Sequence, residues 1–203
     1  MIGGQGINGS WEKDKYERSR AFEVFQGRLF VGLEQPKGEV WAWDGKAWEK
    51  VGGDGIAGSW SESLGVPVLK AYHGRLYAGV YYDRQLRGEV WAYDGAKWEA
   101  VGQPRSIKGQ LEKGFCSPYS MTVMDDSLIV GFTSRKQACL FSFNGKRWLD
   151  LAGKWIEDYV GVYEIWLHDG FLFAGMYKNR LGNGHVYRYD GKSWEKVGGN
   201  GIR

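Results

Sequence analysis

Apolar and polar residues alternate along most of this chain, in short runs separated by turn residues. Alternation with a period of two predicts β-strands with one buried face. The clearest example is Val40-Trp41-Ala42-Trp43, followed by Asp44-Gly45 and then by Lys46-Ala47-Trp48. An Asp-Gly pair between two such runs is a strong signal for a tight β-hairpin. No interval shows a sustained period of 3.6 residues, which disfavours a helical solenoid.

This hairpin occurs four times in the sequence. The four copies close on tryptophans that are 50, 50 and 46 residues apart, namely Trp48, Trp98, Trp148 and Trp194. A repeat of this length indicates a solenoid, a propeller or another array in which each unit must stack on its neighbours to bury its apolar face.

A second hairpin precedes each of these copies. In the first repeat, Ala21–Gln26 and Arg28–Leu33 flank Gly27, upstream of Glu39–Asp44 and Lys46–Val51. A glycine recurs inside the second predicted strand, at Gly32, Gly79, Gly131 and Gly175. Such a glycine marks a place where neighbouring backbone approaches closely.

Four up-and-down strands per repeat are typical of the blade of a β-propeller. We therefore predict an all-β fold, a four-bladed β-propeller with four antiparallel strands per blade, as a single domain over residues 1–203. The predicted blades span approximately residues 12–51, 61–101, 112–151 and 160–198.

The longest complete copy of the repeat runs from Gly38 to Trp60, as Gly-Glu-Val-Trp-Ala-Trp-Asp-Gly-Lys-Ala-Trp-Glu-Lys-Val-Gly-Gly-Asp-Gly-Ile-Ala-Gly-Ser-Trp. It resembles a bacterial β-propeller repeat type, and parts of it recur at Gly3–Trp11, Gly88–Val101 and Gly184–Ile202. In blade size and Trp-Gly density the chain is also loosely similar to the tachylectin and tectonin class of propeller lectins. That resemblance implies a propeller that binds sugars, although no sugar-site motif matches.

One glycine-rich element occurs near both ends of the sequence, since Ile2–Ile7, Val51–Ile56 and Val197–Ile202 are copies of it. In a ring closed by one chain, the two terminal copies compete for one place. Either one copy pairs loosely or latches the ring, or chains join head to tail, or the sequence is a segment of a longer array. The motif G-x-G-x-x-G at Gly4–Gly9 and Gly53–Gly58 matches a dinucleotide fingerprint, but no helix is predicted to follow. We interpret these glycines as a crossing between blades.

Composition and charge narrow the function. The net charge of +3 is too small to predict nucleic-acid binding. We see no signal peptide and no apolar run long enough for a membrane helix, and the two cysteines, Cys116 and Cys139, fit a reduced compartment. We therefore expect a cytoplasmic or particle-associated protein without membrane insertion, in which one disulfide stays an alternative.

Motifs for catalysis are not apparent. The sequence has no H-E-x-x-H, C-x-x-C or G-x-S-x-G pattern, and the carboxylates Glu39, Glu89, Asp44 and Asp94 recur at equivalent positions of the repeats. We interpret these carboxylates as turn and surface residues. The resulting expectation is a protein that is not an enzyme, with no cofactor and no catalytic or metal-binding residue.

The variable links between second and third strands carry the strongest functional signal, because cations and tyrosines recur in them. Together with three tryptophans, they give the candidate ligand-binding residues Tyr81, Tyr82, Arg84, Arg87, Arg135, Lys136, Tyr177, Lys178, Arg180, Trp11, Trp60 and Trp155. Trp11 and Trp60 could present a flat face to a sugar, although a structural role as a wedge between blades is the preferred interpretation.

These residues and repeats are compatible with two functions from different classes. The leading hypothesis is a non-enzymatic binding module that engages an anionic or glycan-like ligand on the loop-bearing face. The alternative is a structural or assembly protein whose partner is another protein, in a virion, a fibre or a multi-subunit particle, with oligomerisation through the repeated termini.

Overall fold

The computed structural model describes residues 2–12, 16–82, 88–102, 116–134, 137–178 and 184–198, with only the backbone of Lys154 and Trp155. The chain divides into two compact units, Met1–Ser106 and Ile107–Arg203. The fold is all-β. No helix among the described residues is long and apolar enough to cross a membrane.

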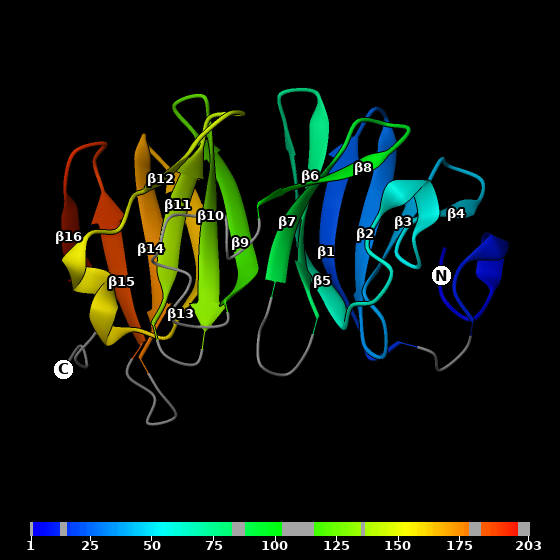
Figure 1. The fold of residues 1–203 in the computed structure, drawn as a ribbon, viewed down its shortest axis with the longest axis horizontal. Helices are drawn as coiled ribbons and strands as arrows, with labels where there is room; N and C mark the ends of the chain where they lie inside the picture. Colours follow the sequence, from blue (N-terminus) through cyan, green and yellow to red (C-terminus); the bar gives the residue numbers. More distant parts are fainter. Residues whose placement is uncertain are drawn as a thin grey trace. The chain divides into compact units, whose positions relative to one another are not determined.

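The first unit contains one eight-stranded antiparallel sheet built from two repeats (Figure 1). Repeat 1 consists of β1 (Arg18–Phe25), β2 (Arg28–Glu34), β3 (Glu39–Trp43) and β4 (Trp48–Gly52). Repeat 2 consists of β5 (Gly65–Tyr72), β6 (Arg75–Tyr81), β7 (Gly88–Tyr93) and β8 (Trp98–Gly102). Within each repeat every strand pairs with the next one along the chain, and a single pair, Glu34 with Gly65, joins the two repeats.

The second unit is built in the same way. Repeat 3 consists of β9 (Cys116–Met124), β10 (Ser127–Ser134), β11 (Cys139–Phe143) and β12 (Trp148–Asp150). Repeat 4 consists of β13 (Gly161–His168), β14 (Phe171–Tyr177), β15 (Gly184–Tyr189) and β16 (Trp194–Gly198). The pair Thr133 with Gly161 joins them. The short 3-10 helices are η1 (Ile7–Gly9), η2 (Ile56–Gly58) and η4 (Lys154–Asp158).

These strands confirm the four-stranded repeat but not the closed propeller. The prediction of one four-bladed ring is corrected, because the structure shows two eight-stranded curled sheets, one in each unit. The alternating pattern determines which side of a strand is apolar, whereas ring closure depends on how many repeats the curvature accommodates. The hairpin pattern does not encode that number.

The Asp-Gly hairpin turns form for a local reason. The carboxylate of Asp44 accepts hydrogen bonds from the backbone N–H groups of Lys46 and Ala47, at 2.8 and 2.9 Å. Asp94, Asn144 and Asp190 make the same pair of bonds in the other repeats. A side chain that caps its own turn in this way favours the turn over continued strand.

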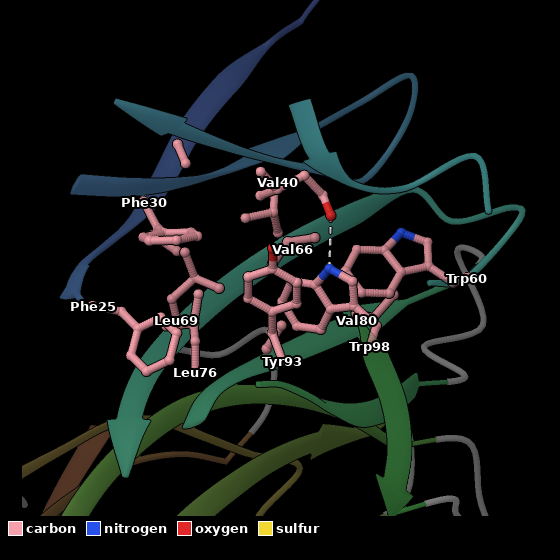
Figure 2. Packing of buried hydrophobic residues seen from close by; sticks show 14 residues of the cluster. Phe25, Phe30, Val40, Trp60, Val66, Leu69, Leu76, Val80, Tyr93 and Trp98 are labelled. Carbon is pink, nitrogen blue, oxygen red and sulfur yellow. Dashed lines mark hydrogen bonds between the residues drawn. The ribbon is translucent and has the colours of Figure 1, made fainter. Parts of the chain in front are cut away.

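The core of the first unit lies between repeat 1 and repeat 2 (Figure 2). Repeat 1 contributes Phe30 and Val40, and repeat 2 contributes Leu69, Leu76 and Trp98, all nearly inaccessible to solvent. A corresponding core in the second unit contains Leu140 of repeat 3 with Ile165 and Leu172 of repeat 4. Stacking of repeats therefore buries the apolar faces, as the repeat period predicts.

Two strand glycines allow this close stacking. A Cβ atom on Gly32 would lie 2.4 Å from the carbonyl oxygen of Val66 in the neighbouring repeat. A Cβ atom on Gly131 would lie 2.7 Å from Cγ1 of Val162. The prediction that strand glycines mark close backbone approach is confirmed at Gly32, whereas at Gly131 the close neighbours are side-chain atoms.

The glycine-rich elements precede repeats 1 and 2 and pack on them in the same way. The indole Nε1 of Trp48 donates to the Ile2 carbonyl at 2.7 Å, and that of Trp98 donates to the Val51 carbonyl at 2.8 Å (Figure 2). We call residues 2–11 and 51–60 the first and second linkers. Each contains only a three-residue 3-10 turn, preceded by a glycine with φ near +75°. The linkers thus lack the helix that a dinucleotide site requires. The glycines of the second linker lie in the crossing between repeats 1 and 2, as predicted.

Candidate functional site at the loop edge

The loop edge is the end of each repeat at which the second strand ends and the third strand begins. Tyr81 ends β6 and Tyr177 ends β14, with Tyr82 and Lys178 directly after them. Five other candidates lie outside the described residues, namely Arg84, Arg87, Arg135, Lys136 and Arg180. The side chain of Trp155 lies outside them as well.

One position of this edge carries a different polar residue in different repeats. It directly precedes Val40, Val90, Leu140 and Val186 of the third strands, of which the first three are buried, and it is occupied by Glu39, Glu89, Cys139 and His185. The surrounding framework is repeated almost unchanged. A variable polar position on a constant scaffold is where functional differences between repeats are expected.

In repeat 1 this position is the centre of an ionic network. Glu39 is 2% exposed and accepts hydrogen bonds from Trp41 Nε1 at 2.9 Å and from Lys50 Nζ at 2.6 Å. Lys50 and Lys37 also donate to the carboxylate of Asp54, at 2.6 and 2.9 Å. Hydrogen bonds from the two lysines lower the pKa of Asp54 to about 2. Two described cations of the edge are therefore neutralised by carboxylates.

In repeat 2 the same position joins an aromatic cluster. The Tyr82 hydroxyl donates to the carboxylate of Glu89, which also accepts from Trp91 Nε1 at 2.9 Å. Burial, reinforced by the carboxylate, raises the pKa of Tyr82 above its usual range. Tyr82 is thus a neutral hydrogen-bonding group beside an anionic acceptor and an indole.

Repeat 4 places a histidine at this position. His185 is 8% exposed, and its Nδ1 shares a hydrogen bond with the Tyr159 hydroxyl, which also lies 3.1 Å from the Tyr187 hydroxyl. Burial is the main reason why the pKa of Tyr159 is raised. Three polar aromatic side chains thus meet at the loop edge of this repeat.

Repeat 3 has a thiol there instead. The Sγ atoms of Cys139 and Cys116 lie 3.9 Å apart, as two hydrogen-bonded thiols. A disulfide requires about 2.05 Å, so no bond joins the two sulfur atoms in this structure. The hydrogen bond between the thiols raises the pKa of Cys139 and lowers that of Cys116.

A further buried carboxylate ends the second strand of repeat 1. Glu34 is 1% exposed, with Arg18 and Arg20 at 3.8 and 4.0 Å from its oxygens. Burial raises the pKa of Glu34, and the two arginines oppose that shift. Arg18 adds positive charge to the surface of the edge, because 61% of its side chain is exposed.

Trp60 does not present a face to a ligand. It is 3% exposed, donates from Nε1 to the Gly38 carbonyl at 2.7 Å, and packs edge-on against Trp91 and Trp98. This burial and packing favour the interpretation of Trp60 as a wedge over that as a sugar platform. Trp11 of the first linker is half-buried and packs in the same way against Trp41 and Trp48.

Part of the site was not predicted from the sequence. Glu39 and Glu89 were interpreted as surface residues because they recur, yet Glu39 is buried and Glu89 is bonded to two aromatic side chains. Aligning the four repeats column by column would have shown Glu, Glu, Cys and His at one position. Among the described residues no group of three or more His, Cys, Asp or Glu side chains could hold a metal ion.

Comparison with known proteins shows likeness in fold only. No protein-family model and no curated protein matches the chain. The extracellular domain of a putative hybrid two-component system from B. thetaiotaomicron superposes with a TM-score of 0.60 at 11% identity over 88% of this chain. The match spans 22% of that protein, so this chain corresponds to less than a quarter of its length.

Two further solved structures extend the comparison. The GH74 xyloglucanase from Xanthomonas campestris has a TM-score of 0.56 at 15% identity, covering 89% of this chain and 29% of the enzyme. YCF48 bound to D1 peptide has a TM-score of 0.53 at 11% identity, covering 92% of this chain and 54% of that protein. These neighbours are β-propeller-like proteins, which supports a propeller-type fold but neither the specific repeat type nor the likeness to tachylectins.

The comparison corrects one expectation. We expected a protein that is not an enzyme, but the fold neighbours include a xyloglucanase and the α-L-arabinofuranosidase from Clostridium thermocellum, which has a TM-score of 0.54 at 12% identity over 89% of this chain and 71% of the enzyme. The fold is therefore compatible with an enzymatic role. The absence of familiar catalytic motifs was an insufficient argument, because propeller enzymes bring side chains together from distant strands.

Proposed function

We propose that this chain is a propeller-type binding protein whose loop edge engages a polyhydroxylated, anionic ligand such as an acidic glycan. The observation that carries the proposal is the cluster of Tyr82, Glu89 and Trp91, which combines an aromatic surface with donor and acceptor groups at the loop edge of repeat 2. Sugar hydroxyls require such mixed partners, and the polar groups of a binding site fix the orientation of its ligand.

Repeat 4 supports the same interpretation with different chemistry. Tyr159, His185 and Tyr187 again offer hydroxyl and ring nitrogen groups beside aromatic surface. The loop cations Arg84, Arg87, Arg135, Lys136, Lys178 and Arg180 would supply the attraction for the negative charge of the ligand. The Lys178 side chain is 39% exposed and lies 3.8 Å from Asp158, which leaves room for a ligand carboxylate to compete.

An array of neutral and acidic glycans, followed by calorimetry on the retained glycan, tests the proposal. We expect replacement of the six loop cations by Gln to abolish binding and to leave the melting temperature nearly unchanged, because exposed charges contribute little to folding. We expect the pair Tyr82→Phe and Glu89→Gln to weaken binding at least tenfold.

Glu99→Gln is the matched control, since Glu99 lies on the outer strand of the same repeat, pairs with Arg75 at 2.9 Å and is 60% exposed. Binding to the array by Glu99→Gln at wild-type affinity, together with loss in the loop-edge variants, supports the site. The proposal is contradicted if the wild-type chain binds neither neutral nor acidic glycans, or if the loop-edge variants keep the wild-type affinity.

A second candidate function is protein–protein assembly, and a separate observation favours it. Apolar side chains are exposed together on β13 to β16, where Trp166 is 71% exposed and Val186 and Val197 are 39% and 44% exposed. Several exposed large apolar side chains on neighbouring strands are typical of protein interaction sites.

A further inference from the structure

Within each unit, one face of a repeat packs on the opposite face of the repeat that follows it. We call the face that contacts the following repeat the leading face, and the face that contacts the preceding repeat the trailing face. The leading face of repeat 1 includes Val40 and Val51, and the trailing face of repeat 2 includes Leu69, Leu76 and Trp98, all in one buried cluster. Repeats 3 and 4 form the same kind of contact. The molecule thus shows twice which two surfaces fit together.

The leading face of repeat 4 keeps part of the apolar contact surface and exposes it, with Glu164 and Arg188 where repeat 1 has the buried Ala21 and Ala42. Val186 pairs with Gly175 in the ladder as Val40 pairs with Gly32, so the two valines are equivalent. Val40 is 0% exposed and Val186 is 39% exposed. Trp166, opposite Phe173 on the same face, is the most exposed large apolar side chain among the described residues.

Gly175 gives an independent sign of the same open surface. A Cβ atom on its equivalents Gly32 and Gly131 would collide with the next repeat, at 2.4 Å from Val66 O and 2.7 Å from Val162 Cγ1. On Gly175 the nearest atom would be Glu164 O, within its own repeat, at 3.7 Å. The glycine that admits a following repeat is therefore present, and the space beside it is open.

The trailing face of repeat 1 is exposed in part: Val31, Leu33 and Trp48 are buried with Trp11 and Tyr16 packed against them, but the apolar side chains of β1 on this face are open. Phe22 pairs with Val31 as Leu69 pairs with Ala78, so Phe22 and Leu69 are equivalent. Leu69 is 4% exposed, whereas Phe22 is 57% exposed and Val24, two residues further on, is 63% exposed.

We propose that the leading face of repeat 4 packs on the trailing face of repeat 1 of a second copy of this chain, head to tail. The second copy is the occupant because its repeat 1 presents the same kind of face that covers each internal leading face. A contact between two different faces leaves one of each free, so it continues until a ring closes or a filament grows. The inference rests on the second candidate function and uses no loop-edge residue, so its failure leaves the ligand proposal untouched.

Light scattering after size exclusion, with three single variants, tests the inference. Trp166→Glu places a charge on the leading face of repeat 4 and should prevent its contact. Phe22→Glu does the same to the trailing face of repeat 1. Leu149→Glu is the control, because Leu149 is 59% exposed and the other three repeats carry Glu49, Glu99 and Glu195 at that position. We expect the wild-type chain and Leu149→Glu to have a mass of two or more chains. Each face variant alone should have the mass of one chain.

Mixing the two face variants is the decisive step. Each retains the face that the other has lost, so we expect a one-to-one pair that grows no further. If Trp166→Glu disrupts assembly and Phe22→Glu does not, the contact joins two identical faces and the inference is overturned.

Hydroxyl-radical footprinting of Trp166 separates the remaining outcomes. Protection that increases with protein concentration supports the inference. A wild-type single chain with oxidised Trp166 overturns self-association but leaves assembly with another protein open. A single chain with protected Trp166 overturns both, because the face is then covered within the chain.

Discussion

Trp98 connects the outer strand of repeat 2 to the chain that precedes it. Its side chain is 4% exposed, and its indole donates to Val51 across 47 residues of sequence. We expect Trp98→Ala to lower the free energy of unfolding by about 3–5 kcal/mol, because a large aromatic leaves a cavity in the core. Urea denaturation measures this loss, and a loss below about 1 kcal/mol would contradict the assigned packing.

Trp194 provides a comparison for that prediction. It makes the same bond, to the Leu151 carbonyl at 2.8 Å, but its side chain is only half-buried. We expect Trp194→Ala to cost less than Trp98→Ala, since less apolar area is lost from the interior. Equal losses at the two sites would show that repeat 4 is as enclosed as repeat 2.

Asp54 makes the first unit sensitive to acid. Its pKa is about 2 in the folded protein, against 3.8 for the unperturbed group, because Lys50 and Lys37 donate hydrogen bonds to it. A lowered folded-state pKa gives stability that is complete above the unfolded pKa and is lost as pH falls through the folded pKa. We expect Asp54→Asn to flatten the pH dependence of the urea midpoint between about pH 4 and pH 2. An unchanged slope would mean that the lysine contacts contribute nothing in solution.

At the scale of the strand, two glycines at equivalent positions should respond differently to one substitution. A Cβ at Gly32 meets the Val66 backbone at 2.4 Å, while a Cβ at Gly175 meets nothing closer than 3.7 Å. We expect Gly32→Ala to destabilise the protein by about 1–3 kcal/mol through overpacking. Gly175→Ala should be neutral or slightly stabilising, because alanine restricts the unfolded chain. Thermal denaturation of both variants checks the pair, and equal effects would contradict the difference in packing.

The elements of this fold could be predicted from the sequence because their signals are local. The turns at Gly27 and Asp44-Gly45 were predicted correctly, since Asp44 caps its own turn with bonds to the backbone of Lys46 and Ala47. Closure of the repeats into a ring could not be predicted, because Phe22 and Val186 show the same alternation whether or not another repeat covers them.

The candidate site was predicted only in part for a related reason. Tyr82 was named correctly as a loop-edge residue, but its acceptor Glu89 looked like any other recurring carboxylate. A charged residue in an alternating strand can face water or a buried indole, and the choice depends on a partner seven residues away. Trp60 was named as a possible platform because a tryptophan after a glycine-rich linker has no local sign of burial.

For the whole molecule, association should couple stability to concentration. A contact that forms only between folded chains stabilises them by mass action, so the melting temperature rises with protein concentration. We expect this rise for the wild-type chain and for Leu149→Glu, and its loss in Trp166→Glu. Calorimetry over a range of concentrations measures it, and a wild-type melting temperature independent of concentration would contradict head-to-tail association.

The bond from Trp98 to Val51 has a consequence for how such chains can be recombined. The outer strand of each of the first two repeats is bonded to the linker before it, so the smallest unit that keeps this bond begins at a linker and not at a first strand. A graft cut before β5 would leave its tryptophan without the carbonyl it needs, whereas a graft of residues 51–102 carries both partners. Shuffling of these repeats, in the laboratory or in descent, should therefore succeed at linker boundaries and fail between a linker and its strands.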